Sequence, residues 1–160
     1  MYETGYVYHI KNEYFAKAND PNLMENKEGA SKRPTYYCIK DEKTDIMWVI
    51  PMSSKFEKYR AIHDSQIKKR GECLGIEFGV DDWKQSVFLL QNMFPITMEY
   101  IDHIHTIGKD VRPVEHELQG RILRKFNRIR FFQSKGRKMT FTDVDRLEKL
   151  MLDELETYNG

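Results

Sequence analysis

The pattern of apolar and polar positions predicts that strands dominate the first two thirds of the chain. Five runs rich in aromatic and β-branched residues are typical of strands; they span residues 6–10, 35–39, 46–50, 74–80 and 86–93. The second and third runs flank a polar turn at residues 41–45 and therefore predict an antiparallel hairpin. We expect Pro51 to end the second strand of this hairpin, because proline has no N–H to donate to a ladder.

Apolar residues that recur every three or four positions predict three longer helices. The first starts right after Ser54, which is its N-cap, with Glu57 completing a capping box and Gly71 as its stop. The second covers residues 113–135, and the third opens with a capping box at Thr142. The shorter expected elements are a helical turn at 13–18, a long loop at 19–33, a short helix at 97–103 and a brief strand at 105–107.

These elements fit a single domain, residues 1–160, that is strand-rich over 1–107 and helix-rich over 112–157. Strands come first and helices last, rather than in alternation. The predicted class is therefore α+β, with several helices on one mostly antiparallel sheet or partly closed barrel.

Composition excludes several classes of protein. No apolar run approaches the ~18 residues of a membrane span, and residues 1–6 lack the features of a signal peptide. Cys38 and Cys73 lie far apart, so we expect two buried thiols in a protein of the reducing cytoplasm rather than a disulfide.

The formal net charge of +1 hides a strong local segregation of charge. Residues 112–138 contain nine Lys or Arg against two Glu, a net +7, and residues 55–70 contain six against two acids, a net +4. An ordinary solvated face mixes both signs, whereas binding to phosphates requires one sign. We therefore expect contacts with nucleic acid, and the candidate residues are Lys58, Lys68, Lys69, Arg70, Arg121, Arg124, Lys125 and Arg128.

Familiar catalytic motifs are absent from the sequence, which has no phosphate-binding loop, dinucleotide fingerprint or nucleophile elbow. His103 and His105 stand two positions apart, with His116 beyond them. No third metal ligand follows at a fixed spacing, so the sequence favours packing histidines and predicts no metal and no other cofactor.

The segment 51–55 is the strongest candidate for chemistry. A strand delivers the hydroxyls of Ser53 and Ser54 and the ammonium of Lys55 to the start of a helix, where free N–H groups favour an anion. If the hairpin pairs antiparallel, Arg33 lies at the same end as Ser53. Such a set fits metal-free RNA cleavage, in which the 2′-hydroxyl attacks its own 3′-phosphate and cations stabilise the charge on the phosphorus.

Three motifs carry a family resemblance; in chain order they are Ile10-x-x-x-Tyr14, Arg33-Pro34 and Ile50-Pro51-Met52-Ser53-Ser54-Lys55. Their order resembles the toxins of type III toxin–antitoxin systems, the ToxN/AbiQ superfamily. Residues 55–59, 71–73 and 89–97 are most similar to its CptN-like branch. The resemblance spans nearly the whole chain and implies a MazF/Kid-type, SH3-like fold: a small curved antiparallel β-barrel or sheet elaborated with helices.

The resemblance also implies an activity and its partners. Such toxins are metal-independent endoribonucleases that leave a 2′,3′-cyclic phosphate, and a repeated pseudoknot RNA antitoxin inhibits them in a protein–RNA hetero-oligomer. The active-site positions implied are Arg33, Ser53, Ser54 and Lys55, with Tyr14 beside them to stack a base or assist proton transfer. Arg33 stands where lysine is common in the family and cannot act as an acid or base. Lys58, one helical turn on, is the alternative to Lys55.

Two other functions fit the same residues. A non-catalytic RNA-binding module would use the same basic faces, with Ser54 only capping a helix. A toxin of this fold that acts on a protein target would leave cellular RNA intact.

Overall fold

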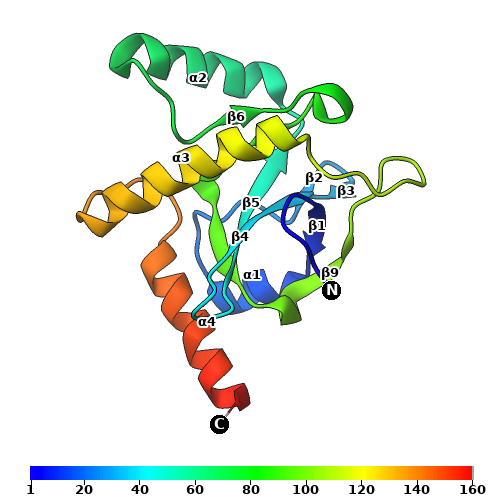
Figure 1. Cartoon of the computed structure of the whole chain (residues 1–160), viewed down its shortest axis with the longest axis vertical. Helices are drawn as coiled ribbons and strands as arrows, with labels where there is room; N and C mark the ends of the chain where they lie inside the picture. The colour runs from blue at the N-terminus through cyan, green and yellow to red at the C-terminus, as the bar shows by residue number, and fades with distance from the viewer. Residues whose placement is uncertain (160) are drawn as a thin grey trace.

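The computed structural model describes the backbone of residues 1–159 and the side chains of residues 1–157. Helices surround an antiparallel sheet (Figure 1). The helices of the described part are α1 (Asn12–Ala18), α2 (Phe56–Arg70), α3 (His116–Ser134) and α4 (Val144–Asn159). Its strands are β1 (Val7–Ile10), β2 (Lys27–Glu28), β3 (Ser31–Lys32), β4 (Thr35–Lys40), β5 (Met47–Ser53), β6 (Glu77–Phe78), β7 (Val87–Phe88), β8 (Phe94–Ile96) and β9 (Ile101–Ile104).

The main sheet has the order β6-β7-β5-β4-β1-β9, with β8 also pairing with β5. All of its described pairs are antiparallel. Within the described residues β6 pairs only with β7 and β9 only with β1, so the sheet stays open rather than closing into a barrel. The prediction of an α+β fold built on an antiparallel sheet is confirmed.

The β4–β5 hairpin forms as predicted, but Pro51 does not end its second strand. Strand β5 continues to Ser53, and Pro51 pairs with Thr35 of β4. The N–H of Met52 points toward β4, where it donates to the Pro34 carbonyl (3.0 Å). The nitrogen of Pro51 therefore faces the opposite edge, at the gap between β8, which pairs with Met47–Val49, and β7, which pairs from Met52 onward. No donor is needed at this gap, so proline is tolerated inside the strand.

The long helices match the sequence pattern closely, and the predicted caps are wrong. Helix α2 stops at Gly71, which adopts φ +81°, as expected for a glycine stop. It begins at Phe56, one residue later than predicted, and its N-cap position is Lys55, with no capping hydrogen bond from a side chain. At the start of α4 the carboxylate of Asp143, not the hydroxyl of Thr142, accepts the N–H of Arg146 (3.3 Å).

The segment between residues 74 and 107 differs most from the prediction. Strands β6 and β7 are only two residues each, and a 3-10 turn at Leu90–Asn92 separates β7 from β8. The helix expected at 97–103 is a single 3-10 turn, Met98–Tyr100, followed by β9. Pairing of β9 with β1 outweighs the local helix preference of this stretch.

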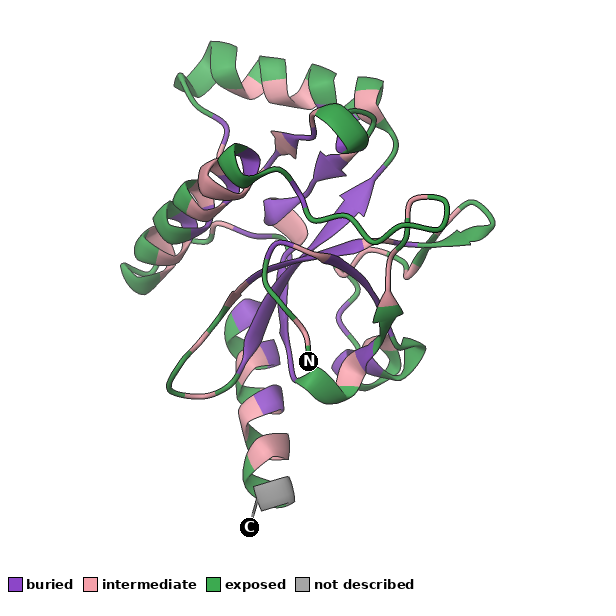
Figure 2. Cartoon of the chain, turned by 45° about the vertical axis from the view of Figure 1, so that its right-hand side comes forward, coloured by how far each residue is buried: buried purple, intermediate pink, exposed green. Residues whose placement is uncertain are grey.

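Two separate apolar clusters hold the fold together. The larger one lies between the sheet and helices α1, α3 and α4, and Cys38 is buried in it. The smaller one joins α2 to β6 and β7 around Tyr59, Cys73 and Phe78. Both cysteines are free and buried, as predicted. Figure 2 shows that α2 presents mostly exposed residues to solvent, since Tyr59 is its one buried residue. No helix of the described chain is long and apolar enough to cross a bilayer.

Candidate active site

Strand β5 carries Ser53 to the end of the sheet, next to β7, where Ser53 pairs with Val87. Ser53 is buried, whereas Ser54 and Lys55 are exposed in the link between β5 and α2. The hydroxyl oxygen of Ser53 accepts the N–H of Lys55 (3.1 Å), which fixes the turn between strand and helix. One buried and one exposed hydroxyl are thus placed side by side at the sheet's end.

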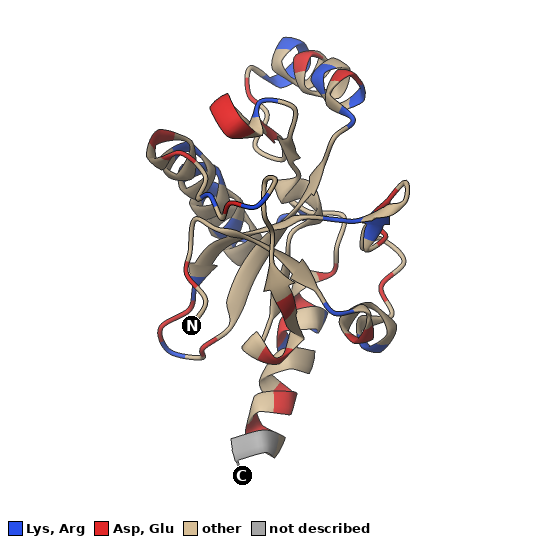
Figure 3. Ribbon diagram, turned by 90° about the vertical axis from the view of Figure 1, so that its right-hand side faces the viewer, with Lys and Arg blue, Asp and Glu red and all other residues tan. Residues whose placement is uncertain are grey.

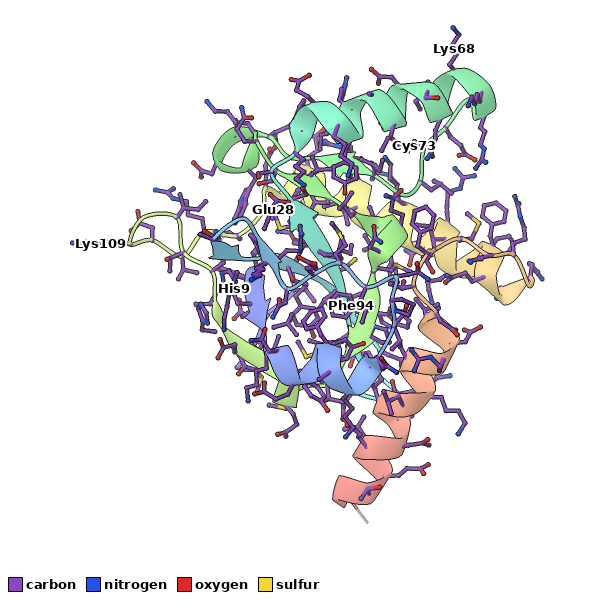
Figure 4. All side chains as sticks on the ribbon, turned by 180° about the vertical axis from the view of Figure 1, so that it is seen from behind. His9, Glu28, Lys68, Cys73, Phe94 and Lys109 are labelled. Atoms are coloured by element: carbon purple, nitrogen blue, oxygen red, sulfur yellow. The ribbon has the colours of Figure 1, made fainter. Side chains whose placement is uncertain are left out.

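The carboxylate of Glu28 accepts hydrogen bonds from both serines. The Ser53 hydroxyl donates to Oε2 (2.5 Å), the Ser54 N–H donates to Oε1 (2.7 Å), and the Ser54 hydroxyl also contacts Oε1. Glu28 belongs to β2, part of a two-stranded hairpin outside the main sheet, and Figure 4 labels it beside the end of β5. We call Ser53, Ser54 and the Arg33 guanidinium, with Glu28 between them, the anion cradle.

Arg33 lies at the same end of the hairpin as Ser53, as the sequence predicts, and its guanidinium is buried. Its Nη1 donates to Glu28 Oε2 (3.0 Å) and to the Met52 carbonyl (2.8 Å). Its remaining N–H groups hold the preceding loop, through the carbonyls of Glu25 (2.7 Å) and Lys27 (3.3 Å). Arg33 therefore positions Glu28 and the loop, and offers only Nη1 to the cradle itself.

The hydrogen bonds of the cradle stabilise the charged form of Glu28. Burial by itself would raise the pKa of this carboxyl. The hydrogen bonds from Ser53, Ser54 and Arg33 outweigh burial and lower the pKa to about 2. Glu28 is consequently an anion at neutral pH, held by donors that suit any small anion.

Lys55 and Lys58 both lie close to the cradle in sequence and are exposed. Neither forms an ion pair with any described carboxylate, although Lys58 lies 5.2 Å from the centre of the Tyr59 ring. Lys55 directly follows Ser54 in the link, whereas Lys58 projects from the first turn of α2. Both ammonium groups are therefore available to an external anion.

Tyr14 lies in the core rather than in the cradle. Its side chain is fully buried, stacked on Phe94 at 5.1 Å, and its hydroxyl donates to the Pro95 carbonyl (2.9 Å). Burial raises the pKa of this phenol well above its usual value. The structure does not bring Tyr14 together with Ser53, and this geometry is that of a packing residue.

A solved structure of another protein is similar to this chain over nearly its whole length. The structure of AbiQ, a lactococcal anti-phage endoribonuclease belonging to the type III toxin–antitoxin system, superposes with a TM-score of 0.70. The match covers 96% of this chain and 99% of AbiQ at 16% sequence identity. This chain has the AbiQ fold. No family model and no curated protein sequence matches the chain.

The AbiQ fold confirms the resemblance to the ToxN/AbiQ superfamily at the level of architecture. It covers nearly all of both chains, so the helices are part of the shared fold rather than additions peculiar to this protein. At 16% identity the match carries the fold and no individual residue, so the roles of the cradle residues must be argued from their own chemistry.

On this AbiQ-like framework the predicted basic face of α3 is largely paired. Lys125 forms an ion pair with Glu77 (3.1 Å) and donates to the Ile76 carbonyl (2.7 Å), and Arg128 contacts Glu72. Arg121 also approaches Glu77, at 3.9 Å. The carboxylates come from the segment after α2, which the sequence pattern alone does not bring near α3.

The basic residues at the end of α2 are different. Lys68, Lys69 and Arg70 are exposed and form no ion pair within the described part of the chain, and Arg124 of α3 shares both properties. Figure 3 shows Lys and Arg distributed along α2, and Figure 4 shows Lys68 pointing away from the body of the protein. Within the described chain, the unpaired positive charge therefore lies mainly on α2 rather than on α3.

Two of the histidines considered as metal ligands, His103 and His105, pack against His9, whereas His116 is exposed at the start of α3. The Nε2 of His9 lies 2.9 Å from the Nδ1 of His105, and His9 stacks on His103 at 4.6 Å. Burial and the two neighbouring histidines, together with Lys32, lower the pKa of His9 to about 4. His9 is therefore neutral at pH 7, and the three rings join the ends of β1 and β9.

Proposed function

We propose that this chain is the toxin of a type III toxin–antitoxin system, an endoribonuclease that cleaves RNA without a metal ion. In this proposal it acts in the cytoplasm, where its RNA substrates are, and a repeated pseudoknot RNA inhibits it in a protein–RNA complex. The AbiQ fold supports the class of protein, and the anion cradle supports the chemistry.

The observation that carries the proposal is the convergence of Ser53, Ser54 and Arg33 on one carboxylate. Two hydroxyls and a backbone N–H are donors that stabilise the oxygens of a phosphorane, and the guanidinium holds the carboxylate beside them. They need no reorganisation when charge develops, because β5 and the Arg33 anchors already hold them. A scissile phosphate that displaces Glu28 from these donors binds next to Lys55, which follows Ser54 in the chain.

In the proposed reaction each residue has a distinct task. The hydroxyls of Ser53 and Ser54 orient the non-bridging oxygens of the phosphate, and Lys55 neutralises the developing charge and protonates the leaving 5′-oxygen. Arg33 keeps the loop and the cradle in place. The chemistry selects RNA over DNA, because the nucleophile is the 2′-hydroxyl of the substrate.

The RNA backbone beyond the scissile phosphate is proposed to follow α2. Lys58 lies at its start and Lys68, Lys69 and Arg70 at its end, all exposed and without described ion pairs. Arg124 extends this surface onto α3. Arg121, Lys125 and Arg128 are less favourable contacts, because RNA would have to compete with Glu72 and Glu77 for them.

The proposal is tested by incubating the purified chain with a mixed-sequence RNA in EDTA. Wild-type protein is expected to produce fragments with 2′,3′-cyclic phosphate and 5′-hydroxyl ends, identified by mass spectrometry. Ser53→Ala and Lys55→Ala should each cut far more slowly while still binding RNA. Intact RNA under all conditions would leave a non-catalytic RNA-binding module, and toxicity without RNA fragments would indicate a protein target.

Two further measurements refine the proposal. Lys55→Ala compared with Lys58→Ala identifies the lysine that serves the reaction, since only the catalytic one should alter the rate at saturating RNA. A short tandem repeat directly upstream of the gene should encode the antitoxin. Its transcript is expected to bind the chain and block cleavage, and a transcript of scrambled sequence serves as the control.

A further inference from the structure

Metal-free cleavage requires a group that removes the proton of the 2′-hydroxyl, and of the predicted site residues only Tyr14 was expected to assist proton transfer. A guanidinium and an ammonium group are hydrogen-bond donors without an acceptor, so Arg33 and Lys55 do not suit this role. Tyr14 is buried and bonded to a carbonyl. Of the side chains that contact the cradle hydroxyls in the described part of the chain, Glu28 is the one able to accept a proton at neutral pH.

We propose that Glu28 is the general base of the reaction, the group that takes the 2′-hydroxyl proton as the cleavage begins. The inference rests on the proposed ribonuclease activity. It adds a catalytic residue that the family motifs do not include and that lies 25 positions from Ser53 in the sequence.

The geometry places Glu28 beside the reacting atoms once a phosphate is bound. In the free protein the hydroxyls of Ser53 and Ser54 and the Ser54 N–H donate to the Glu28 carboxylate. A bound phosphate accepts these hydrogen bonds in its place. Arg33 Nη1, at 3.0 Å from Oε2, remains to hold Glu28 against the phosphate. The 2′-hydroxyl and the scissile phosphate belong to the same nucleotide, so the displaced carboxylate faces that hydroxyl.

The β2–β3 hairpin permits this small displacement. Its strands have two residues each and lie outside the main sheet, and the neighbours of Glu28 at Lys27, Gly29 and Ala30 are exposed. The side chain of Glu28 can therefore turn from the serines toward the sugar without disturbing the core.

The step balances in atoms and charge. As the 2′-oxygen forms its bond to phosphorus, its proton passes to a Glu28 carboxylate oxygen, and the bond from phosphorus to the 5′-oxygen breaks. The leaving oxygen keeps the electron pair and takes a proton from the Lys55 ammonium. Exchange of one proton from Glu28 to Lys55 through solvent then restores both groups.

Substrate binding also strengthens the base. In the free protein the serine and arginine hydrogen bonds hold the Glu28 pKa at about 2. A bound phosphate removes most of these bonds and brings a second negative charge nearby, and both changes raise the pKa of the carboxyl. Arg33 and Lys55 oppose the rise, as the remaining charged groups at the site.

The test compares Glu28→Gln and Glu28→Asp with wild type on an RNA that has a single cleavage site. Glutamine keeps the shape and an acceptor oxygen but cannot take the proton. The rate at saturating protein should fall about 10²–10⁴-fold. Affinity for the same RNA carrying a 2′-deoxy nucleotide at the scissile position should stay within about threefold. Aspartate should restore part of the rate.

Controls separate this inference from the proposed function. Glu42→Gln makes the same chemical change on the exposed β4–β5 turn and should cut as wild type. The acid limb of the pH–rate profile at saturating protein should be present in wild type and absent from Glu28→Gln. A purely structural role would shift the melting temperature without removing that limb.

The outcomes are distinct. If wild type cuts and Glu28→Gln cuts equally fast, Glu28 is not the base and the ribonuclease assignment stands. If Glu28→Gln cuts faster and binds more tightly, Glu28 is a competitor for the phosphate site, and the inference is overturned. If wild type itself never cuts RNA, the proposed function fails first.

Discussion

At the scale of one residue, the role of Arg33 depends on the geometry of its guanidinium as well as on its charge. Its guanidinium serves one carboxylate oxygen and three backbone carbonyls at once. Arg33→Lys keeps the charge but cannot reach all four acceptors from a single nitrogen. We expect the free energy of unfolding to fall by roughly 1–3 kcal/mol, measured by urea denaturation.

The same variant should weaken the hydrogen bonding that holds the Glu28 carboxylate. With fewer donors the pKa of its carboxyl should rise from about 2 toward the ordinary value of 4.5, which carboxyl-carbon NMR titration can follow. Lys43→Arg on the exposed β4–β5 turn serves as the control. An unchanged Glu28 pKa in Arg33→Lys would show that Arg33 does not position the carboxylate.

Residue-scale prediction from sequence succeeds where contacts are fixed by local pairing. Arg33 and Ser53 lie together because they stand at the open end of one hairpin, whose register is set by its short polar turn. Glu28 could not be found in this way. It lies in a stretch rich in Gly, Asn and Ser that is typical of a loop, and its partners Ser53 and Ser54 are 25 and 26 positions away in sequence. The sequence offers one indirect indication of such a residue. Because Arg33 cannot act as a base, the reaction requires another group near it, and a carboxylate fits that role.

At the scale of elements, α2 and α3 share a basic sequence and differ in their surroundings. The cations at the end of α2 are unpaired in the described structure, whereas those of α3 contact Glu72 and Glu77. Replacing Lys68, Lys69 and Arg70 together by alanine should weaken RNA binding. It should also reduce the slope of log affinity against log salt by about 2.

The matched variant replaces Arg121, Lys125 and Arg128 by alanine. It should change the salt slope less, because RNA gains little from cations that already have partners, and it should lower the melting temperature. Fluorescence anisotropy with a 2′-O-methyl RNA measures both slopes without cleavage. A larger loss of slope from the α3 variant would mean that RNA displaces Glu72 and Glu77.

Element boundaries were predictable where the signal is local. Helix α2 ends at Gly71, because only glycine adopts the φ of +81° at low cost. The strands from β6 to β9 were not, since their short runs become strands only through partners such as β1 and β5. Pro51 shows the same limit, because the gap that tolerates it lies between two other strands.

At the scale of the whole molecule, the histidine cluster links folding to pH. The folded pKa of His9 is about 4, below its ordinary value of 6.5, because of burial and the nearby His103, His105 and Lys32. The unfolded chain therefore binds more protons between these values. The contribution of His9 to the free energy of unfolding is fully present above about pH 6.5. It falls by roughly 2–3 kcal/mol as the pH drops toward 4.

His9→Phe removes the titration and keeps a ring to stack on His103. Its unfolding free energy should vary less than that of wild type between pH 7 and pH 4, measured by urea denaturation at each pH. Glu28 acts in a lower window, since its folded pKa of about 2 lies below 4.5, so the two contributions separate along the pH axis. His116→Asn, an exposed histidine at the start of α3, is the control and should retain the wild-type slope. Equal slopes in wild type and His9→Phe would show that His9 is as easily protonated in the folded chain as in the unfolded one.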